Sequence, residues 1–278
     1  MSIKFHKMHG AGNDFILLDL REQDYPLDSR RAGLISDRRL GVGCDQILLV
    51  QNPVRPENAA AYEIWNSDGS AALQCGNGAR CIGLYLEWNG ELDADTFSIE
   101  SPSGDIGMKR CPDGQFEATM GVPDFAPSNV PLMLASEAGI YRLESPWGQL
   151  KLGAVSMGNP HALVLIDDIA DSRIPEYGAF ISSHAAFPEG CNTGFAQLDG
   201  RDRIRLRVYE RGAGETLACG SGACAAVAIL RQWGRVGDVV DVLLPGGHLV
   251  IKWPGNNQPL KMKGPAVHVF TGKLSEGS

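Results

Sequence analysis

The sequence predicts an α+β protein of two pseudo-symmetric domains, each a barrel-like mixed or antiparallel sheet around one central helix. Two observations support this prediction. The motif CGNGAR at residues 75–80 returns as CGSGAC at residues 219–224, which is 219 − 75 = 144 positions later in a chain of 278 residues. Each half also contains many short β-type runs and about one long helix, without the regular strand–helix alternation of a doubly wound sheet.

The repeat extends well beyond these two motifs. Asn13 aligns with Asn159 (159 − 13 = 146), Cys44 with Cys191 (191 − 44 = 147), and Asn66 with Glu210 (210 − 66 = 144). Offsets this constant indicate a duplicated fold, whose functional loops are expected to face one another across an interdomain cleft that holds the active site. The predicted domains are residues 1–122 with 264–278, and residues 123–263. A stretch rich in proline and polar residues, 122–135, is the expected link.

Turn and cap residues delimit the expected elements. Asp28 is a good N-cap for a helix over residues 29–38, and the two Gly-rich cysteine motifs begin helices that end near Trp88 and Trp233. A further helix is expected over residues 177–184. Strands are expected at 3–5, 15–18, 46–51, 60–65, 96–101, 105–109, 116–120, 162–166, 195–198, 203–209, 239–244 and 248–253. The tail, residues 260–273, is expected to form one or two strands that pair with the first half.

Composition excludes several classes of protein. The net charge of −8 argues against a nucleic-acid partner, which favours a basic surface. No apolar run approaches the roughly 18–20 residues of a membrane span, and the N-terminus lacks the features of a signal peptide. A cytoplasmic protein with reduced thiols is therefore expected. The seven cysteines include no Cys-x-x-Cys pair, so no metal site is expected, and no lysine lies in a context that would anchor pyridoxal phosphate.

The two matched cysteines indicate the chemistry. Cys75 and Cys219 each precede a Gly-rich helix start, where unpaired N–H groups and the helix dipole bind a carboxylate and favour a thiolate. If the two starts held one carboxylate, one thiolate would remove the α-proton and the opposite thiol would protonate the other face, which inverts the carbon. The alternative for either cysteine alone is a small buried side chain under a helix.

Polar residues in the repeated loops are candidates for binding a zwitterionic substrate. Each alone is more typical of a turn. They are Asn13, Gln46, Asn66, Asn159 and Asn192. Glu210-Arg211 breaks the symmetry of the two halves and suits an ammonium and a carboxylate, although a surface ion pair is the alternative. His161 is either a structural histidine or a group that tunes a nearby thiol.

Together the motifs resemble diaminopimelate epimerase. The resemblance rests on KMHGAGNDF, GVGCDQ, NSDGSAALQCGNGARC, VSMGNPH, FPEGCN, YERGAGETLACGSGACA and KGPAVHVFTG, and spans residues 4–273. It implies an epimerase, usually dimeric, that needs neither cofactor nor metal and interconverts LL- and meso-2,6-diaminoheptanedioate in lysine and peptidoglycan precursor synthesis. Cys75 and Cys219 match the base and acid, and His161 and Glu210 match residues that modulate their pKa values. The matched substrate-binding positions are Asn13, Gln46, Asn66, Gly76, Asn77, Asn159, Asn192, Glu210, Arg211, Gly220 and Ser221.

Two alternatives remain open at this stage. One is a proline- or hydroxyproline-type racemase, whose first motif typically has histidine where this chain has Asn77, and whose substrate lacks the second amino-acid end that suits Glu210-Arg211. The other is a carboxylate-binding protein of the same fold without catalysis. One departure from the family pattern is TGFAQ after FPEGCN, where Gly194 is expected to loosen the strand and alter the pocket edge.

Overall fold

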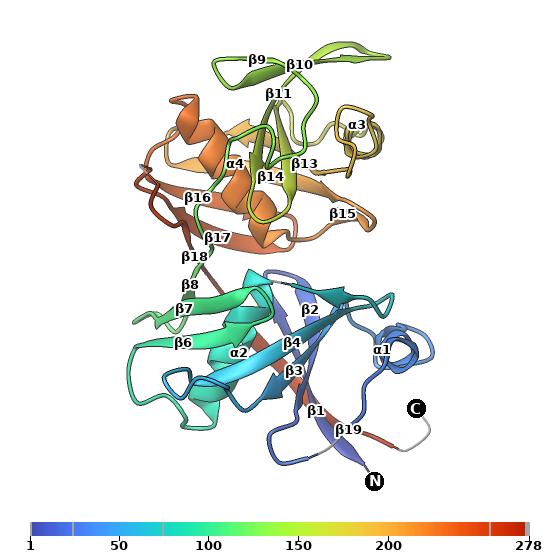
Figure 1. Ribbon diagram of the computed structural model, residues 1–278, viewed down its shortest axis with the longest axis vertical. Coiled ribbons are helices and arrows are strands. Elements are labelled where there is room, and N and C mark those ends of the chain that lie inside the picture. The colour runs from blue at the N-terminus through green and yellow to red at the C-terminus, as the bar shows by residue number, and fades with distance from the viewer. Residues whose placement is uncertain (1, 24, 74, 256, 276–278) are drawn as a thin grey trace. The chain divides into compact units, whose positions relative to one another are not determined.

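The computed structural model describes residues 2–23, 25–73, 75–255 and 257–275, and the chain divides into two compact units (Figure 1). Unit 1 comprises Met1–Thr119 and Gly264–Ser278, and unit 2 comprises Met120–Lys263. Each unit is a mixed β-sheet with two helices among its described residues. The prediction of an α+β fold in two parts is therefore confirmed.

Unit 1 contains β1 to β8, β19, α1 and α2. The strands are β1 (Ile3–Gly10), β2 (Asn13–Asp19), β3 (Gln46–Gln51), β4 (Ala60–Asn66), β5 (Ala71–Ala72), β6 (Thr96–Ser101), β7 (Gly104–Arg110), β8 (Phe116–Thr119) and β19 (Val267–Leu274). The helices are α1 (Ser29–Ser36) and α2 (Gly76–Trp88). Asp28 caps α1 as expected, because its side chain accepts the N–H of Arg31.

Unit 2 contains β9 to β18, α3 and α4. The strands are β9 (Ser136–Glu137), β10 (Ile140–Ser145), β11 (Gly148–Ser156), β12 (Pro160–Leu165), β13 (Asn192–Leu198), β14 (Arg203–Glu210), β15 (Gly214–Thr216), β16 (Val239–Leu244), β17 (Gly247–Lys252) and β18 (Lys261–Gly264). The helices are α3 (Ile174–Ser182) and α4 (Gly220–Gln232). The last residue of β18, Gly264, belongs to unit 1.

Strand pairing repeats between the units. In unit 1, β2 pairs with β3 and β4 with β6 in parallel, and the other recorded pairs are antiparallel. In unit 2, the parallel pairs are β12 with β13 and β14 with β16, at the same places in the order of strands. The expected duplication is therefore present in the topology. The chain's last strand, β19, pairs with β1, which confirms that the tail returns to the first half.

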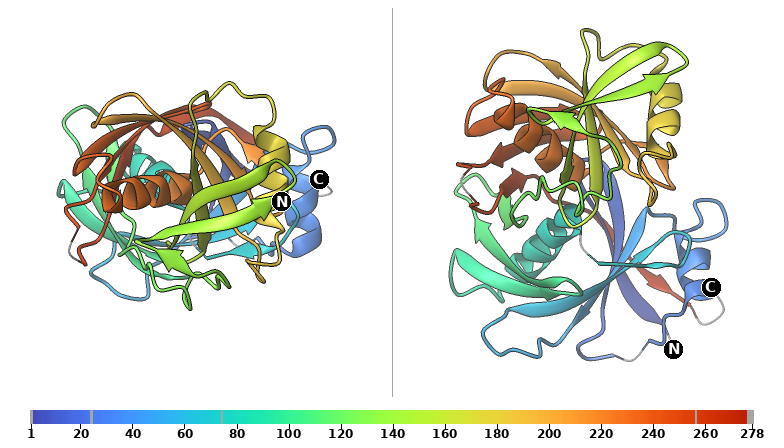
Figure 2. Two further views of the ribbon diagram at one scale, coloured as in Figure 1. Left: turned by 90° about the horizontal axis from the view of Figure 1, so that it is seen from above. Right: turned by 45° about the horizontal axis from the view of Figure 1, so that its top comes forward.

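The central helix of each unit is buried against its own sheet. α2 contacts β1, β7, β8 and β19, and α4 contacts strands from β11 to β14 and β17; both views in Figure 2 show each helix packed within its sheet. Close packing depends on glycine: an added Cβ at Gly153 of β11 would lie 2.3 Å from the Ile229 side chain of α4. Gly90 and Gly234, both with positive φ, follow the ends of these helices.

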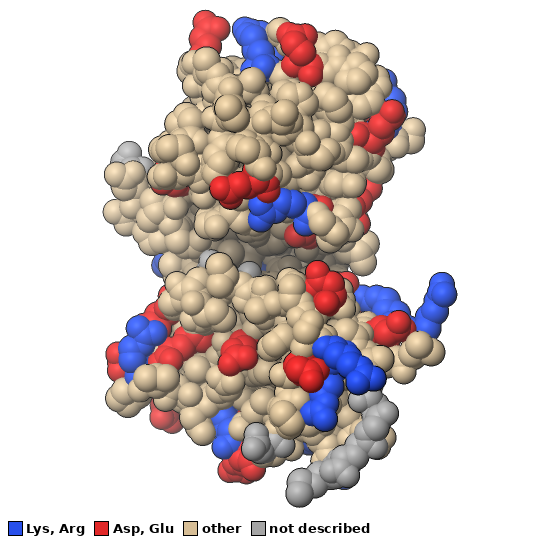
Figure 3. Space-filling model, turned by 45° about the vertical axis from the view of Figure 1, so that its right-hand side comes forward, with Lys and Arg blue, Asp and Glu red and all other residues tan. Residues whose placement is uncertain are grey.

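The surface of the units is mixed in charge. Figure 3 shows Lys and Arg interspersed with Asp and Glu on the visible face, without an extended patch of either sign. No helix among the described residues has both the length and the apolar character that crossing a membrane requires.

Two expectations about local structure differ from the structure, and one hairpin was not predicted. α3 spans Ile174–Ser182 instead of residues 177–184, because a proline fits its first turn. β10 and the first part of β11 form a hairpin that was not predicted. Gly194 does not loosen its strand: it pairs with Leu163 on one side and Val208 on the other, within an unbroken β13. An added Cβ there would lie 3.1 Å from Leu163 Cδ1 and 3.4 Å from Leu206 Cδ1, so this glycine packs closely against two leucine side chains.

Candidate active site

Each candidate catalytic cysteine is the N-cap of its unit's central helix. Cys75 precedes α2 with φ −145° and Cys219 precedes α4 with φ −116°, so both have extended backbone immediately before the first helical turn. The first N–H groups of a helix have no acceptor inside it, and they carry the positive end of the dipole. Each unit therefore presents a thiol beside donors suited to a carboxylate. Cys75 is half-buried and Cys219 is buried.

In unit 1 the structure joins Cys75 to two of the predicted polar residues. The Cys75 thiol donates to Asn13 Oδ1 over 3.6 Å, and the same oxygen accepts the Asn77 side-chain amide over 3.3 Å. Gln46 and Asn66 face one another as partners on β3 and β4, and Gln46 Nε2 donates to Asn66 Oδ1 over 2.8 Å. The strand order thus gathers the candidate residues of unit 1 into two hydrogen-bonded groups.

In unit 2 the thiol of Cys219 is surrounded by polar groups of α4 and β14. Its sulfur accepts the Gly222 N–H over 3.4 Å and lies 3.6 Å from Ser221 Oγ. Burial raises the pKa of Cys219 well above its usual value, and the nearby Glu210 carboxylate raises it further. Glu210 itself accepts the Thr216 hydroxyl over 2.5 Å. Burial and the Glu210 carboxylate therefore both favour the protonated form of Cys219.

The other polar candidates of unit 2 form a second group. His161 Nε2 lies 3.0 Å from Asn159 Oδ1, and an amide oxygen only accepts, so this nitrogen carries the proton. Asn192 accepts the Arg211 backbone N–H over 2.9 Å, and His161 and Asn192 are partners on parallel strands. The guanidinium of Arg211 donates to the Glu189 carbonyl over 2.5 Å. The structure thus places Glu210 beside Cys219, and Arg211 with Asn192.

We expect acid to destabilise the protein through His161. The side chain is buried, and burial followed by the charge of Arg211 lowers its pKa from 6.5 to about 3. Between pH 6.5 and about pH 3 the histidine is protonated in the unfolded chain but neutral in the folded protein. The free energy of unfolding should therefore fall by about 1 kcal/mol for each pH unit of acidification in that range. Urea unfolding at pH 7 and pH 4.5 measures this loss, which should be smaller in His161→Gln.

The matched control is the exposed His248, which contacts Asp241 on the neighbouring strand of the same unit. His248→Gln should keep the acid sensitivity of the unmodified protein. An equal loss of stability on acidification in all three proteins would contradict the assignment to His161.

Three of the other cysteines, Cys44, Cys81 and Cys191, are buried, and none of them is the N-cap of a described helix. Burial raises the pKa of Cys44 to about 11 and the pKa values of Cys81 and Cys191 to about 12. The matched pair Cys44 and Cys191 therefore lacks the helix start that Cys75 and Cys219 share.

Three residues in the recognised motifs support the site without having been predicted. Asp45 accepts the Asn13 side-chain amide over 3.2 Å, Thr216 binds Glu210, and Arg80 donates to Asn77 over 2.8 Å. The motifs contain all three, but only the folded chain shows which amide or carboxylate each one contacts.

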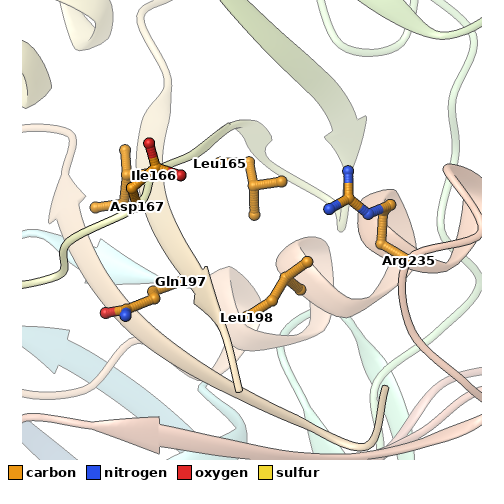
Figure 4. Close-up of a pocket in the computed structure, with 6 residues that line it drawn as sticks. All are labelled: Leu165, Ile166, Asp167, Gln197, Leu198 and Arg235. Carbon is orange, nitrogen blue, oxygen red and sulfur yellow. The ribbon is translucent and has the colours of Figure 1, made fainter. Parts of the chain in front are cut away.

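A cavity of about 190 Å³ in unit 2 is separate from these groups (Figure 4). Its lining residues are Leu165, Ile166, Asp167, Gln197, Leu198 and Arg235. None of them is a predicted site residue, so the cavity is not assigned to the site.

Comparison with known proteins gives relatives over almost the whole chain. The family model described as diaminopimelate epimerase matches residues 5–126 and 153–269. A diaminopimelate epimerase of Xanthomonas axonopodis pv. citri is 49% identical over 272 residues, covering 98% of this chain and 96% of the relative. One of Xylella fastidiosa (strain M12) is 46% identical over 271 residues, covering 97% and 95%.

Solved structures share the fold at much lower identity. A hydroxyproline epimerase from Agrobacterium vitis, with bound trans-4-hydroxy-L-proline, is 16% identical with a TM-score of 0.71, covering 98% of this chain and 91% of that chain. A phenazine biosynthesis protein of the PhzF family from Bacillus anthracis is 14% identical with a TM-score of 0.67, covering 99% of both chains. At these identities the likeness extends to the fold alone.

Proposed function

Because this chain belongs to the diaminopimelate epimerase family, we propose that it interconverts LL- and meso-2,6-diaminoheptanedioate through a two-cysteine proton transfer. The observation that carries the mechanism is the matched pair of N-cap cysteines, Cys75 on α2 and Cys219 on α4. The reaction belongs to the synthesis of lysine and of a peptidoglycan precursor. It needs neither a cofactor nor a metal ion, because thiols and backbone amides supply the acid, the base and the carboxylate site.

The proposed reaction removes one proton from the α-carbon and adds one proton to the opposite face of that carbon. A thiolate takes the α-proton, the C–H electron pair delocalises into the adjacent carboxylate, and the opposite thiol protonates the other face of the same carbon. The backbone amides of Gly76, Asn77, Gly220 and Ser221 bind the reacting carboxylate and stabilise the charge that develops on it. Both cysteines must reach one α-carbon from opposite faces. Each turnover exchanges the protonation states of the two cysteines, so the form of the enzyme that releases the product is the form that catalyses the reverse reaction.

Asymmetric residues are proposed to select the substrate. Glu210 and Arg211 occupy the positions that Asn66 and Ser67 occupy in the repeat, so only one half offers a carboxylate beside a guanidinium. An ammonium on Glu210 and a carboxylate on Arg211 would bind the second amino-acid end of the substrate. Glu210 also contacts Cys219, so it couples substrate binding to the ionisation of that thiol. We assign the remaining substrate contacts to Asn13, Gln46, Asn66, Asn159 and Asn192, and the tuning of a thiol to His161.

Exchange in heavy water tests the proposal. The purified protein is incubated with LL-2,6-diaminoheptanedioate in heavy water without added cofactor or metal. The meso product formed early should carry one solvent deuterium at the inverted carbon, while recovered substrate carries none, because different groups remove and deliver the proton. Absence of both the meso product and the deuterium would overturn the proposal.

A parallel incubation addresses the proline-type alternative, which the low-identity structural relatives raise. L-Proline and trans-4-hydroxy-L-proline should remain unexchanged, since they lack the second ammonium and carboxylate that Glu210 and Arg211 would bind. Inversion of either compound at a rate equal to that of the diamino acid would favour the alternative.

We also propose that the protein is a cytoplasmic homodimer. Its support is the family resemblance together with three large apolar side chains exposed on β19, Val267, Val269 and Phe270, with Trp88 of α2 also exposed in unit 1. Sedimentation at micromolar concentration distinguishes a dimer from a monomer.

A further inference from the structure

Arg80 of unit 1 is a fully buried charged side chain that the proposed reaction does not use. Its exposed fraction is 0%, and it lies on the second turn of α2, five residues after Cys75. A buried guanidinium has a high desolvation cost, so its hydrogen-bond acceptors indicate what it does in the fold.

The acceptors of Arg80 are at the start of α2 and near the end of the chain. Its guanidinium donates to the Gly76 carbonyl over 3.2 Å, to Asn77 Oδ1 over 2.8 Å and to the Pro265 carbonyl over 3.4 Å. Gly10 of β1 provides the space, because a Cβ there would lie 3.3 Å from Nη2. The cation therefore binds the oxygen of the Asn77 side chain, which leaves the amide nitrogen of Asn77 directed toward Asn13.

Two charged residues thus fix the direction of two amides beside Cys75. Asn77 Nδ2 donates to Asn13 Oδ1 over 3.3 Å, and Asn13 Nδ2 donates to the Asp45 carboxylate over 3.2 Å. A guanidinium only donates and a carboxylate only accepts, so neither amide can turn over without losing a charged partner. The amide oxygen of Asn13 is therefore the group that faces the Cys75 thiol, 3.6 Å away.

The equivalent positions of unit 2 carry different residues and make different bonds. The residue equivalent to Arg80 is Cys224 (224 − 80 = 144), and the residue equivalent to Asn13, Asn159, is bonded to His161. There the sulfur of Cys219 accepts the Gly222 N–H and caps its own helix, whereas Cys75 makes no cap bond and donates to Asn13. The two otherwise matched cysteines have different partners.

We propose that Arg80 is a positioning residue for Cys75, acting through Asn77 and Asn13 so that an amide oxygen accepts the Cys75 thiol proton. This inference extends the proposed function, in which Cys75 alternates between thiol and thiolate. In the half of the cycle when Cys75 carries the proton, Asn13 sets the direction of the S–H bond.

The test measures how fast iodoacetamide alkylates Cys75 at pH 7, by mass spectrometry of the modified peptide. Arg80→Lys keeps the positive charge but loses the planar fork that holds Asn77. Losing one hydrogen bond to the thiol should raise the thiolate fraction, and with it the alkylation rate, by about five-fold. In an Asn13→Ala background the same substitution should change the rate less than about two-fold, because the acceptor is already absent.

Two controls keep the experiment specific. Arg110→Lys makes the same change at a partly exposed ion pair of unit 1, and it should change the alkylation rate of Cys75 by less than about two-fold. The alkylation rate of Cys219 in unit 2 is measured in every sample, and it should also stay within about two-fold of its rate in the unmodified protein. If Arg80→Lys does not fold, Asn77→Ala removes the middle link and should accelerate Cys75 alkylation in the same way.

An unchanged Cys75 rate in a folded Arg80→Lys variant would overturn the inference, as would an equal five-fold effect with and without Asn13. If Arg80→Lys does not fold and Asn77→Ala does, an unchanged Cys75 alkylation rate in Asn77→Ala would overturn the inference. Alkylation requires no turnover, so these results are independent of whether the heavy-water assay finds epimerisation.

Discussion

Cys75→Ala and Cys219→Ala should each abolish epimerisation, lowering kcat by at least about 10³-fold. A positioned acid or base contributes about 10²–10⁴-fold, and inversion requires both groups on opposite faces of one carbon. The remaining thiol cannot replace the missing one, because each thiol exchanges a proton with only one face of the α-carbon. Conversion of LL to meso substrate, followed by chiral chromatography, measures the loss.

Cys224→Ala is the matched control for these variants. It removes a buried thiol from α4, the helix that Cys219 caps, and leaves Cys219 in place. Its kcat should stay within about three-fold of the unmodified protein once unfolded material is accounted for. Substantial epimerisation by Cys75→Ala or by Cys219→Ala would contradict the two-cysteine mechanism, although the chain would still belong to the same family.

Glu210→Gln should give the second largest effect, a loss of about 10²–10³-fold in kcat/KM. The substitution removes a proposed ammonium partner and the carboxylate beside Cys219. The carboxylate raises the pKa of Cys219, so its removal should lower that pKa and speed alkylation of Cys219 at neutral pH. Activity should fall while the reactivity of the thiol rises, and a loss of folding would not produce this combination for Cys219 alone.

Glu215→Gln provides the control on the adjacent strand. Glu215 pairs with Arg207 near the surface, where an ion pair contributes about 0–1 kcal/mol to stability. Both kcat/KM and the alkylation rate of Cys219 should remain close to those of the unmodified protein. A slower alkylation of Cys219 in Glu210→Gln would contradict the assigned electrostatic effect.

The repeated elements were the most predictable part of the fold. Both central helices begin after a cysteine within a Gly-rich motif and end near a glycine of positive φ, so local chemistry defines them at both ends. The return of the tail to the first half was also predicted, and β19 pairs with β1. The hairpin of β10 and β11 was not predicted, although Ile140–Ser145 alternates apolar and charged residues as a half-buried strand does. β10 pairs with β11 as β19 pairs with β1, but β10 precedes its partner in the chain while β19 comes from the far end, so the sequence repeat does not reveal it.

The contacts of the candidate site were less predictable than its residues. The motifs name Asn13 and Asn77, but an amide side chain has two different ends, and its direction depends on which charged group the folded chain places beside it. Asp45 lies 32 positions from Asn13, and β2, β3 and α2 must all fold before the three amide contacts exist. Gly194 shows the opposite error: a glycine that was expected to loosen its strand pairs with both neighbouring strands and packs closely against Leu163.

The pairing of β19 with β1 has a consequence for the order in which the protein forms during synthesis. Residues 120–263 are made before β19, so unit 2 has all of its strands while unit 1 still lacks one. Until β19 leaves the ribosome, β1 has an open edge along Ile3–Gly10, of the kind that associates with other chains. The usual progression from N-terminal to C-terminal domain is therefore reversed, and the half that is begun first is completed last.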